Sequence, residues 1–123
     1  MTTTNISNEI SSQATFESLG LPEPLLRAVA DAGYAVPTDV QAAAIPPAMA
    51  GADLMVAAAT GSGKTASFII PALQRVLAAR NDPTKKRDKN TVYGPRVLVL
   101  TPTRELAMQI AKAASTYGRH VPG

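Results

Sequence analysis

The sequence predicts an α/β fold, in which helices pack against a parallel sheet and this chain supplies only the first strands of that sheet. Two apolar runs, at residues 54–57 and 96–100, have the continuous apolar character of strands that are buried on both faces. Between them a helical pattern runs from about residue 64 to residue 80, which gives the order strand, helix, strand. Such a unit is expected to form a right-handed crossover between parallel strands. Because a complete domain of this class needs more strands, the predicted sheet is incomplete.

Two helices are predicted ahead of the first apolar run. The first opens at residues 21–24, Leu-Pro-Glu-Pro, where prolines in the first helical turn are tolerated. The second begins at Thr38, which has the spacing of a capping box to Gln41. We expect Pro46 and Pro47 to stop this second helix, because proline lacks the N–H that a position inside a helix donates.

The remaining segments complete the predicted architecture. The long helix after the first strand carries Pro71, where a kink is expected, and the last helix follows the turn at residues 101–105 and ends near Tyr117. Residues 81–93 are predicted to be a loop whose charge run is a solvated surface, with contact to nucleic acid as the alternative. We expect His120, the single histidine, to be an exposed residue at a strand edge without a role.

Composition limits the possible settings of the chain. Residues 1–14 are rich in Ser, Thr, Asn and Gln and predict a disordered tail, which leaves residues 15–123 for about one small domain. A formal net charge of +3 permits an anionic partner such as nucleic acid without requiring one. The absence of cysteine excludes disulfides and fits a cytoplasmic protein. We see no signal peptide, and no apolar run approaches the roughly 20 residues of a membrane span.

One stretch between the first strand and the long helix has the chemistry of a phosphate-binding loop. Its residues are Ala58-Ala59-Thr60-Gly61-Ser62-Gly63-Lys64-Thr65. Glycines allow a tight turn that brings backbone N–H groups to an anion, and the new helix directs its positive dipole end to the same place. Lys64 adds a charge for the outer phosphates, and Thr65 offers a hydroxyl to a phosphate-bound Mg²⁺. The alternative is a flexible turn with an incidental lysine, since position 58 is Ala where the general pattern has Gly.

Three stretches together resemble one family, the DEAD-box ATP-dependent RNA helicases. The phosphate loop is one of them, and Ala at position 58 is the usual choice of this family. The others are Gly33-Tyr34-Ala35-Val36-Pro37-Thr38-Asp39-Val40-Gln41, similar to the Q motif, and Pro102-Thr103-Arg104-Glu105-Leu106-Ala107-Met108-Gln109, similar to motif Ia. Asp39-Val40 departs from the more frequent Pro-Ile. The resemblance covers nearly all of residues 15–123, implies a RecA-like domain, and is closest in wording to bacterial members of the RhlE type.

For the nucleotide, the resemblance implies an ATP and Mg²⁺ site. Gln41 would read the edge of adenine, since an amide donates and accepts at once, although it could equally only close the capping box to Thr38. By the same analogy Tyr34 stacks on adenine and Phe16, 17 residues before Gly33, supports the site. The alternative for both aromatic residues is core packing. Backbone groups of Thr60, Gly61, Ser62 and Gly63 would join Lys64 and Thr65 around the phosphates.

For RNA, the resemblance implies contacts to the backbone of one strand. A guanidinium such as that of Arg104 at the head of a helix can hold a phosphate, and Thr103 and Pro102 lie beside it. The alternative is a surface arginine paired with Glu105. Gln109 is either a further contact or a plain exposed helical position.

ATP hydrolysis needs a carboxylate after a buried strand, and none of the nine acidic residues follows a strand-like apolar run. The Asp-Glu-Ala-Asp stretch of the family is also absent from this sequence. We therefore expect the first part of a helicase domain, truncated before that motif and inactive alone. The alternatives are a catalytically inactive nucleotide- or RNA-binding fragment, a small-molecule kinase with a phosphate loop, and a chain that does not fold. Protein partners are not predicted.

Overall fold

A computed structural model describes residues 14–61, 63–85 and 87–122. The tail predicted for residues 1–14 lies, except for Ala14, outside the described residues. Four α-helices and two short 3₁₀ helices form in the described part of the chain. They are η3 (Glu17–Leu19), α1 (Glu23–Asp31), α2 (Asp39–Met49), α3 (Lys64–Asn81), η4 (Pro83–Lys85) and α4 (Arg104–Tyr117).

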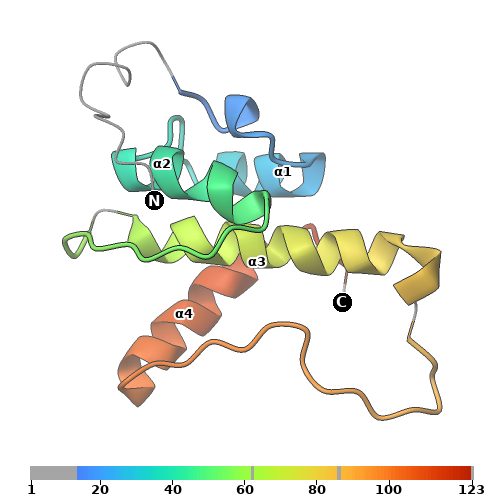
Figure 1. The fold of residues 1–123 in the computed structure, drawn as a ribbon. Coiled ribbons are helices and arrows are strands. Elements are labelled where there is room, and N and C mark those ends of the chain that lie inside the picture. Colours follow the sequence, from blue (N-terminus) through green and yellow to red (C-terminus); the bar gives the residue numbers. More distant parts are fainter. Residues whose placement is uncertain (1–13, 62, 86, 123) are drawn as a thin grey trace.

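The helices are arranged around α3. Figure 1 shows α1 and α2 on one side of α3, whereas α4 crosses beneath it on the other side. Leu25 of α1, Ile45 of α2 and Ile70 of α3 are the largest fully buried side chains, so the core lies where these three helices meet. Phe16 and Tyr117 join the same buried cluster from the two ends of the described chain. Each fully buried side chain of this size contributes about 1.5–3 kcal/mol by leaving water.

The helix boundaries follow local capping signals, with two differences from the prediction. One is that α4 begins at Arg104, inside the turn predicted at residues 101–105, and the other concerns the end of α2. Thr38 and Gln41 form the predicted capping box at the start of α2, and α4 ends at Tyr117 as expected. The prediction that Pro46 and Pro47 stop α2 is wrong, because α2 continues to Met49. Proline has a helical φ angle, and carbonyl oxygens of these prolines still accept hydrogen bonds from Ala50 and Ala52 N–H at 3.1 and 3.0 Å. Pro71 is likewise contained within α3.

The parallel sheet is not confirmed, because no strand forms among the described residues. The predicted burial of residues 54–57 and 96–100 on both faces is also wrong, because their large apolar side chains are exposed. The exposure alternates along each segment: Leu54, Val56, Val97 and Val99 are less exposed than Met55, Leu98 and Leu100. Both segments line a groove of about 540 Å³ over α3, whose lining includes Leu54, Val56, Phe68, Arg75, Arg96 and Val97. No backbone hydrogen bond joins the two segments within the described chain. Neighbouring strands of a sheet lie about 4.8 Å apart and exchange such bonds, so the two segments are not paired.

The segment between α3 and the second apolar run is irregular, apart from η4. The guanidinium of Arg87 lies 5.1 Å from the centre of the Tyr93 ring, and the Tyr93 hydroxyl accepts a hydrogen bond from the Asp88 N–H at 3.1 Å. Figure 1 shows this part of the chain running away from the helices before it returns to α4. The loop predicted at residues 81–93 therefore begins one residue later than predicted, because Asn81 still belongs to α3, and it has its own internal contacts.

Candidate nucleotide-binding site

The phosphate-binding loop turns directly into α3. Gly61 and Gly63 have φ angles of 83° and 85°, in the left-handed region that glycine adopts without strain. Gly63 is the N-cap of α3, and no side chain of the described residues caps this helix. The N–H groups at the start of an 18-residue helix are therefore available to an anion. Ser62, which the sequence places among the phosphate contacts, lies outside the described residues.

The charged and hydroxyl groups of the loop lie at its helical end. Lys64 Nζ donates a hydrogen bond to the carbonyl oxygen of Ala58 at 2.9 Å, so the lysine closes the turn across its own loop. Thr65 is half-buried in the first turn of α3, and Thr60 is exposed at the opposite end of the turn. The ammonium group of Lys64 and the N-terminus of α3 thus belong to the same turn, an arrangement that favours phosphate.

Gln41 connects the start of α2 to the phosphate-binding loop. Its side-chain oxygen accepts from the Thr38 N–H at 3.0 Å, and the Thr38 hydroxyl accepts from the Gln41 N–H at 3.3 Å. The other end of the amide, Nε2, donates to the carbonyl oxygen of Gly63 at 3.2 Å. Since only 3% of Gln41 is exposed, this amide is a fixed part of the site. One N–H and one lone pair of the amide remain for a further partner.

Gly63 is required by a close approach as well as by its φ angle. A Cβ atom at this position would lie 2.5 Å from Gln41 Nε2 and 2.9 Å from the Thr38 hydroxyl oxygen. At Gly61, in contrast, a Cβ atom would meet nothing within 4 Å. The contact between α2 and the loop therefore depends on one glycine, and the two sequence motifs form a single site.

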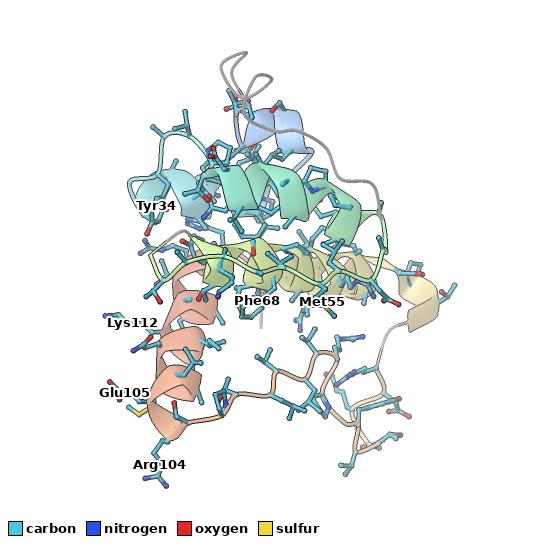
Figure 2. The ribbon with its side chains drawn as sticks, turned by 60° about the vertical axis from the view of Figure 1, so that its left-hand side comes forward. Tyr34, Met55, Phe68, Arg104, Glu105 and Lys112 are labelled. Atoms are coloured by element: carbon cyan, nitrogen blue, oxygen red, sulfur yellow. The ribbon has the colours of Figure 1, made fainter. Side chains whose placement is uncertain are left out.

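The two aromatic candidates occupy different environments. Phe16 is buried in the core cluster, whereas half of Tyr34 is exposed in the connector between α1 and α2. Figure 2 shows Tyr34 projecting from this connector, on the side of the view where α4 also lies. The Tyr34 ring is therefore accessible to a planar ligand, and the Phe16 ring is not.

Sequence reasoning missed the residues around Tyr34. The ring of Tyr117 lies 6.2 Å from the ring of Tyr34 at an interplanar angle of 30°. Burial, together with a hydrogen bond to Tyr34, raises the pKa of Tyr117 to about 12. No motif marks Tyr117, and only its position at the end of the apolar face of the last helix could have indicated its packing.

The prediction for His120 is wrong. Its Nε2 atom lies 2.6 Å from Oδ2 of Asp31, and the residue belongs to no strand. The hydrogen bond to His120 is the main reason why the pKa of Asp31 is lowered. Desolvation is the second-largest effect and opposes it, and the charges of His120, Arg119 and Arg27 each add a smaller lowering effect. This pair connects the end of α1 to the segment after α4, and residues 89 positions apart carry no local signal of their contact.

The third predicted motif lies at the start of α4. The Thr103 hydroxyl caps this helix by accepting from the Leu106 N–H at 3.1 Å. Arg104 and Glu105 point away from the core in Figure 2, and no carboxylate among the described residues lies within ion-pair distance of Arg104. Pro102 and Gln109 are also exposed. The alternative in which Arg104 pairs with Glu105 is therefore not the arrangement in this structure.

The described residues contain no group of three His, Asp or Glu side chains that could hold a metal ion. Thr65 is the one predicted ligand on this chain, and its hydroxyl suits a Mg²⁺ ion only when phosphate oxygens supply further ligands. No helix in the described ranges has the length and apolar character needed to cross a membrane.

A family model described as DEAD/DEAH box helicase matches residues 38–123. The chain is 49% identical over 106 residues to the ATP-dependent RNA helicase SrmB of Escherichia coli, covering 86% of this chain and 22% of that protein. It is 46% identical over 111 residues to the ATP-dependent RNA helicase DeaD of Mycobacterium tuberculosis, covering 90% of this chain and 18% of that protein.

A solved structure is similar as well. The RNA helicase Prp28 from Chaetomium thermophilum, determined with bound ADP, matches with a TM-score of 0.72 and 40% sequence identity over 89% of this chain and 25% of that chain. The chain thus spans about a fifth of the length of the curated relatives it matches and a quarter of this neighbour.

Proposed function

This chain belongs to the DEAD/DEAH box helicase family, and we propose that it is the adenine-nucleotide-binding part of an ATP-dependent RNA helicase. One observation carries the proposal: the Gln41 amide closes the cap of α2 and also bonds to Gly63 in the phosphate-binding loop. An element suited to a base and an element suited to phosphates are thereby fixed beside each other. The relatives named ATP-dependent RNA helicases and the ADP-bound neighbour support the same conclusion.

In this proposal each group has a defined task. The phosphates lie at the start of α3, held by backbone N–H groups of Thr60 to Gly63 and by Lys64, whose ammonium group exchanges its bond to Ala58 for a phosphate oxygen. A Mg²⁺ ion bound to those phosphates takes the hydroxyl of Thr65. Tyr34 offers its exposed ring to the adenine, and the free N–H and lone pair of Gln41 complement the adenine edge. Phe16 supports the site only through the core.

Nucleotide binding is tested by the melting temperature of the 123-residue chain with Mg²⁺ and either ADP or GDP. A ligand that binds only the folded state raises its melting temperature, so ADP should raise it more than GDP. Lys64→Ala should abolish the rise. Lys112→Ala, which removes an exposed lysine of α4, is the matched control and should retain it. Gln41→Ala should reduce the preference for ADP. Equal effects of ADP and GDP in the parent chain would contradict adenine recognition.

The start of α4 is proposed to hold the backbone of an RNA strand. Arg104 carries a guanidinium there that forms no ion pair with any described residue, and the helix N-terminus adds its dipole. In fluorescence titrations with a short single-stranded RNA, Arg104→Ala should weaken binding and reduce the salt dependence by about one released counterion. An unchanged salt dependence would remove Arg104 from the interface.

Hydrolysis is assigned to residues outside this chain. No acidic residue stands directly after either apolar run. The described residues also contain no group of three His, Asp or Glu side chains that could hold a metal ion. The second candidate function is therefore a nucleotide- and RNA-binding module without activity of its own. Measurable ATP hydrolysis by the purified 123-residue chain, abolished by Lys64→Ala, would contradict this part of the proposal.

A further inference from the structure

The end of α4 contacts the connector that carries Tyr34. The Tyr117 ring lies 6.2 Å from the Tyr34 ring, and the side chain of His120 bonds to Asp31 at 2.6 Å. The two contacting residues of each segment are three positions apart in the sequence: Asp31 precedes Tyr34 by three residues, and His120 follows Tyr117 by three. Two separate contacts fix both the position and the orientation of a segment, whereas one contact would leave it free to pivot.

The two sides of this contact differ in how firmly the protein holds them. Tyr117 is 7% exposed and belongs to the core cluster. Gly118 beside it lies so close to α3 that a Cβ atom there would meet a Leu73 methyl carbon at 3.1 Å. Tyr34, in contrast, is 50% exposed and is held locally by a backbone hydrogen bond from its N–H to Val29 at 3.2 Å. The buried ring is therefore the fixed partner, and the exposed ring is the one that it orients.

We propose that Tyr117 and His120 are positioning residues, which hold the Tyr34 ring in the orientation that stacks on adenine. This inference rests on the proposed nucleotide site. An exposed aromatic side chain that is ordered only on binding loses conformational freedom at that moment, which weakens the complex. A ring already restrained by Tyr117, in a connector tied down through Asp31 and His120, avoids that loss. Neither Tyr117 nor His120 touches the nucleotide.

The test compares two ligands that use different parts of the site. ADP needs both the loop and Tyr34, whereas inorganic pyrophosphate needs only the loop. We would measure the dissociation constants of both, with Mg²⁺, for the parent chain, Tyr34→Ala, Tyr117→Leu, Tyr117→Phe and His120→Ala. Met108→Ala on an exposed face of α4 is the matched control. Tyr117→Leu should weaken ADP about five- to tenfold, the range expected when stacking on one aromatic ring is impaired.

The pattern of results decides between positioning and mere stability. The affinity for pyrophosphate should stay within twofold of the parent in every variant. Tyr117→Phe, which keeps the aromatic ring, should bind ADP more tightly than Tyr117→Leu does. His120→Ala should weaken ADP binding less than Tyr117→Leu and leave pyrophosphate binding unchanged. Equal weakening of both ligands in Tyr117→Leu and His120→Ala, or unchanged ADP binding in both, would overturn the inference. If Tyr117→Leu does not fold, His120→Ala decides by the same criterion. A parent chain whose ADP affinity is insensitive to Tyr34→Ala would instead refute the adenine stacking in the proposed function.

Discussion

The helices α1, α2 and α3 and the two apolar segments at residues 54–57 and 96–100 all carry large apolar side chains but differ in what their backbones need. The helices satisfy their hydrogen bonds internally and bury Leu25, Ile45 and Ile70 completely. The apolar segments have no strand neighbour among the described residues and leave Met55, Leu98 and Leu100 exposed. A helix completes its backbone bonds within one stretch of chain, whereas a strand depends on another segment. The helix ends that carry the proposed nucleotide site therefore form without a strand neighbour for either apolar segment among the described residues.

The largest expected effect on stability comes from truncating a buried side chain of the helical core. Ile45→Ala removes a fully buried side chain from the junction of α2 and α3 and should lower the free energy of unfolding by about 2–5 kcal/mol. Leu98→Ser, in a segment that is 74% exposed at this position, should change it by less than about 0.5 kcal/mol. Urea denaturation followed by circular dichroism measures both.

Light scattering adds a second observable to this pair. Leu98→Ser should also reduce association of the chain, because an unpaired apolar segment is a site for contact between molecules. A loss of stability in Leu98→Ser as large as that in Ile45→Ala would mean that residues 96–100 are paired and buried in solution, and the contrast between the two regions would then fail.

The same difference explains how much of the fold could be predicted. Thr38 and Gln41 act within three residues of each other, so the beginning of α2 could be predicted from the sequence. Thr103 caps α4 in the same local way, but residues 101–105 were predicted to be a turn before that helix. The ends of helices were less secure. Pro46 and Pro47 predicted the end of α2, yet the helix continues through them to Met49, since their φ angle is helical although both lack an N–H donor. The strands were predicted from apolar character alone, which records burial but does not supply the neighbour.

The site divides in the same way. The turn from Gly63 into Lys64 is local, and its motif was recognisable. The bond from Gln41 to Gly63 joins residues 22 positions apart and was not predicted; the family resemblance implied only that both motifs serve one nucleotide. The contacts of Tyr117 with Tyr34 and of His120 with Asp31 cross most of the chain. A single sequence has no signal for such pairs, because their spacing is set by the packing of α1 and α4 in three dimensions.

The next effect in size tests whether α2 and the loop form one unit. Gly63→Ala places a Cβ atom against Gln41 and Thr38 and forces a left-handed φ angle, so it should cost about 2–4 kcal/mol and weaken ADP binding. Gly61→Ala shares the φ angle but meets no atom within 4 Å, so about 1–2 kcal/mol is expected. Thermal melts with and without ADP measure both effects. Equal losses in the two variants would mean that strain in the turn, and not contact with Gln41, sets the need for glycine.

The smallest expected effect concerns the pair that joins α1 to the end of the described chain. The hydrogen bond from His120 lowers the pKa of Asp31 below its usual value of 3.8, so the ionised carboxylate is favoured in the folded state. This contribution to stability is present above the usual pKa and is lost as the pH falls from about 4 through the folded value. Asp31→Asn should therefore lower the melting temperature slightly at pH 7 and make the decline below pH 4 less steep. Glu23→Gln, which removes an exposed carboxylate at the other end of α1, is the matched control and should leave the acid limb unchanged. A parallel acid limb in Asp31→Asn and the parent would show that the contact with His120 does not stabilise the folded chain in solution.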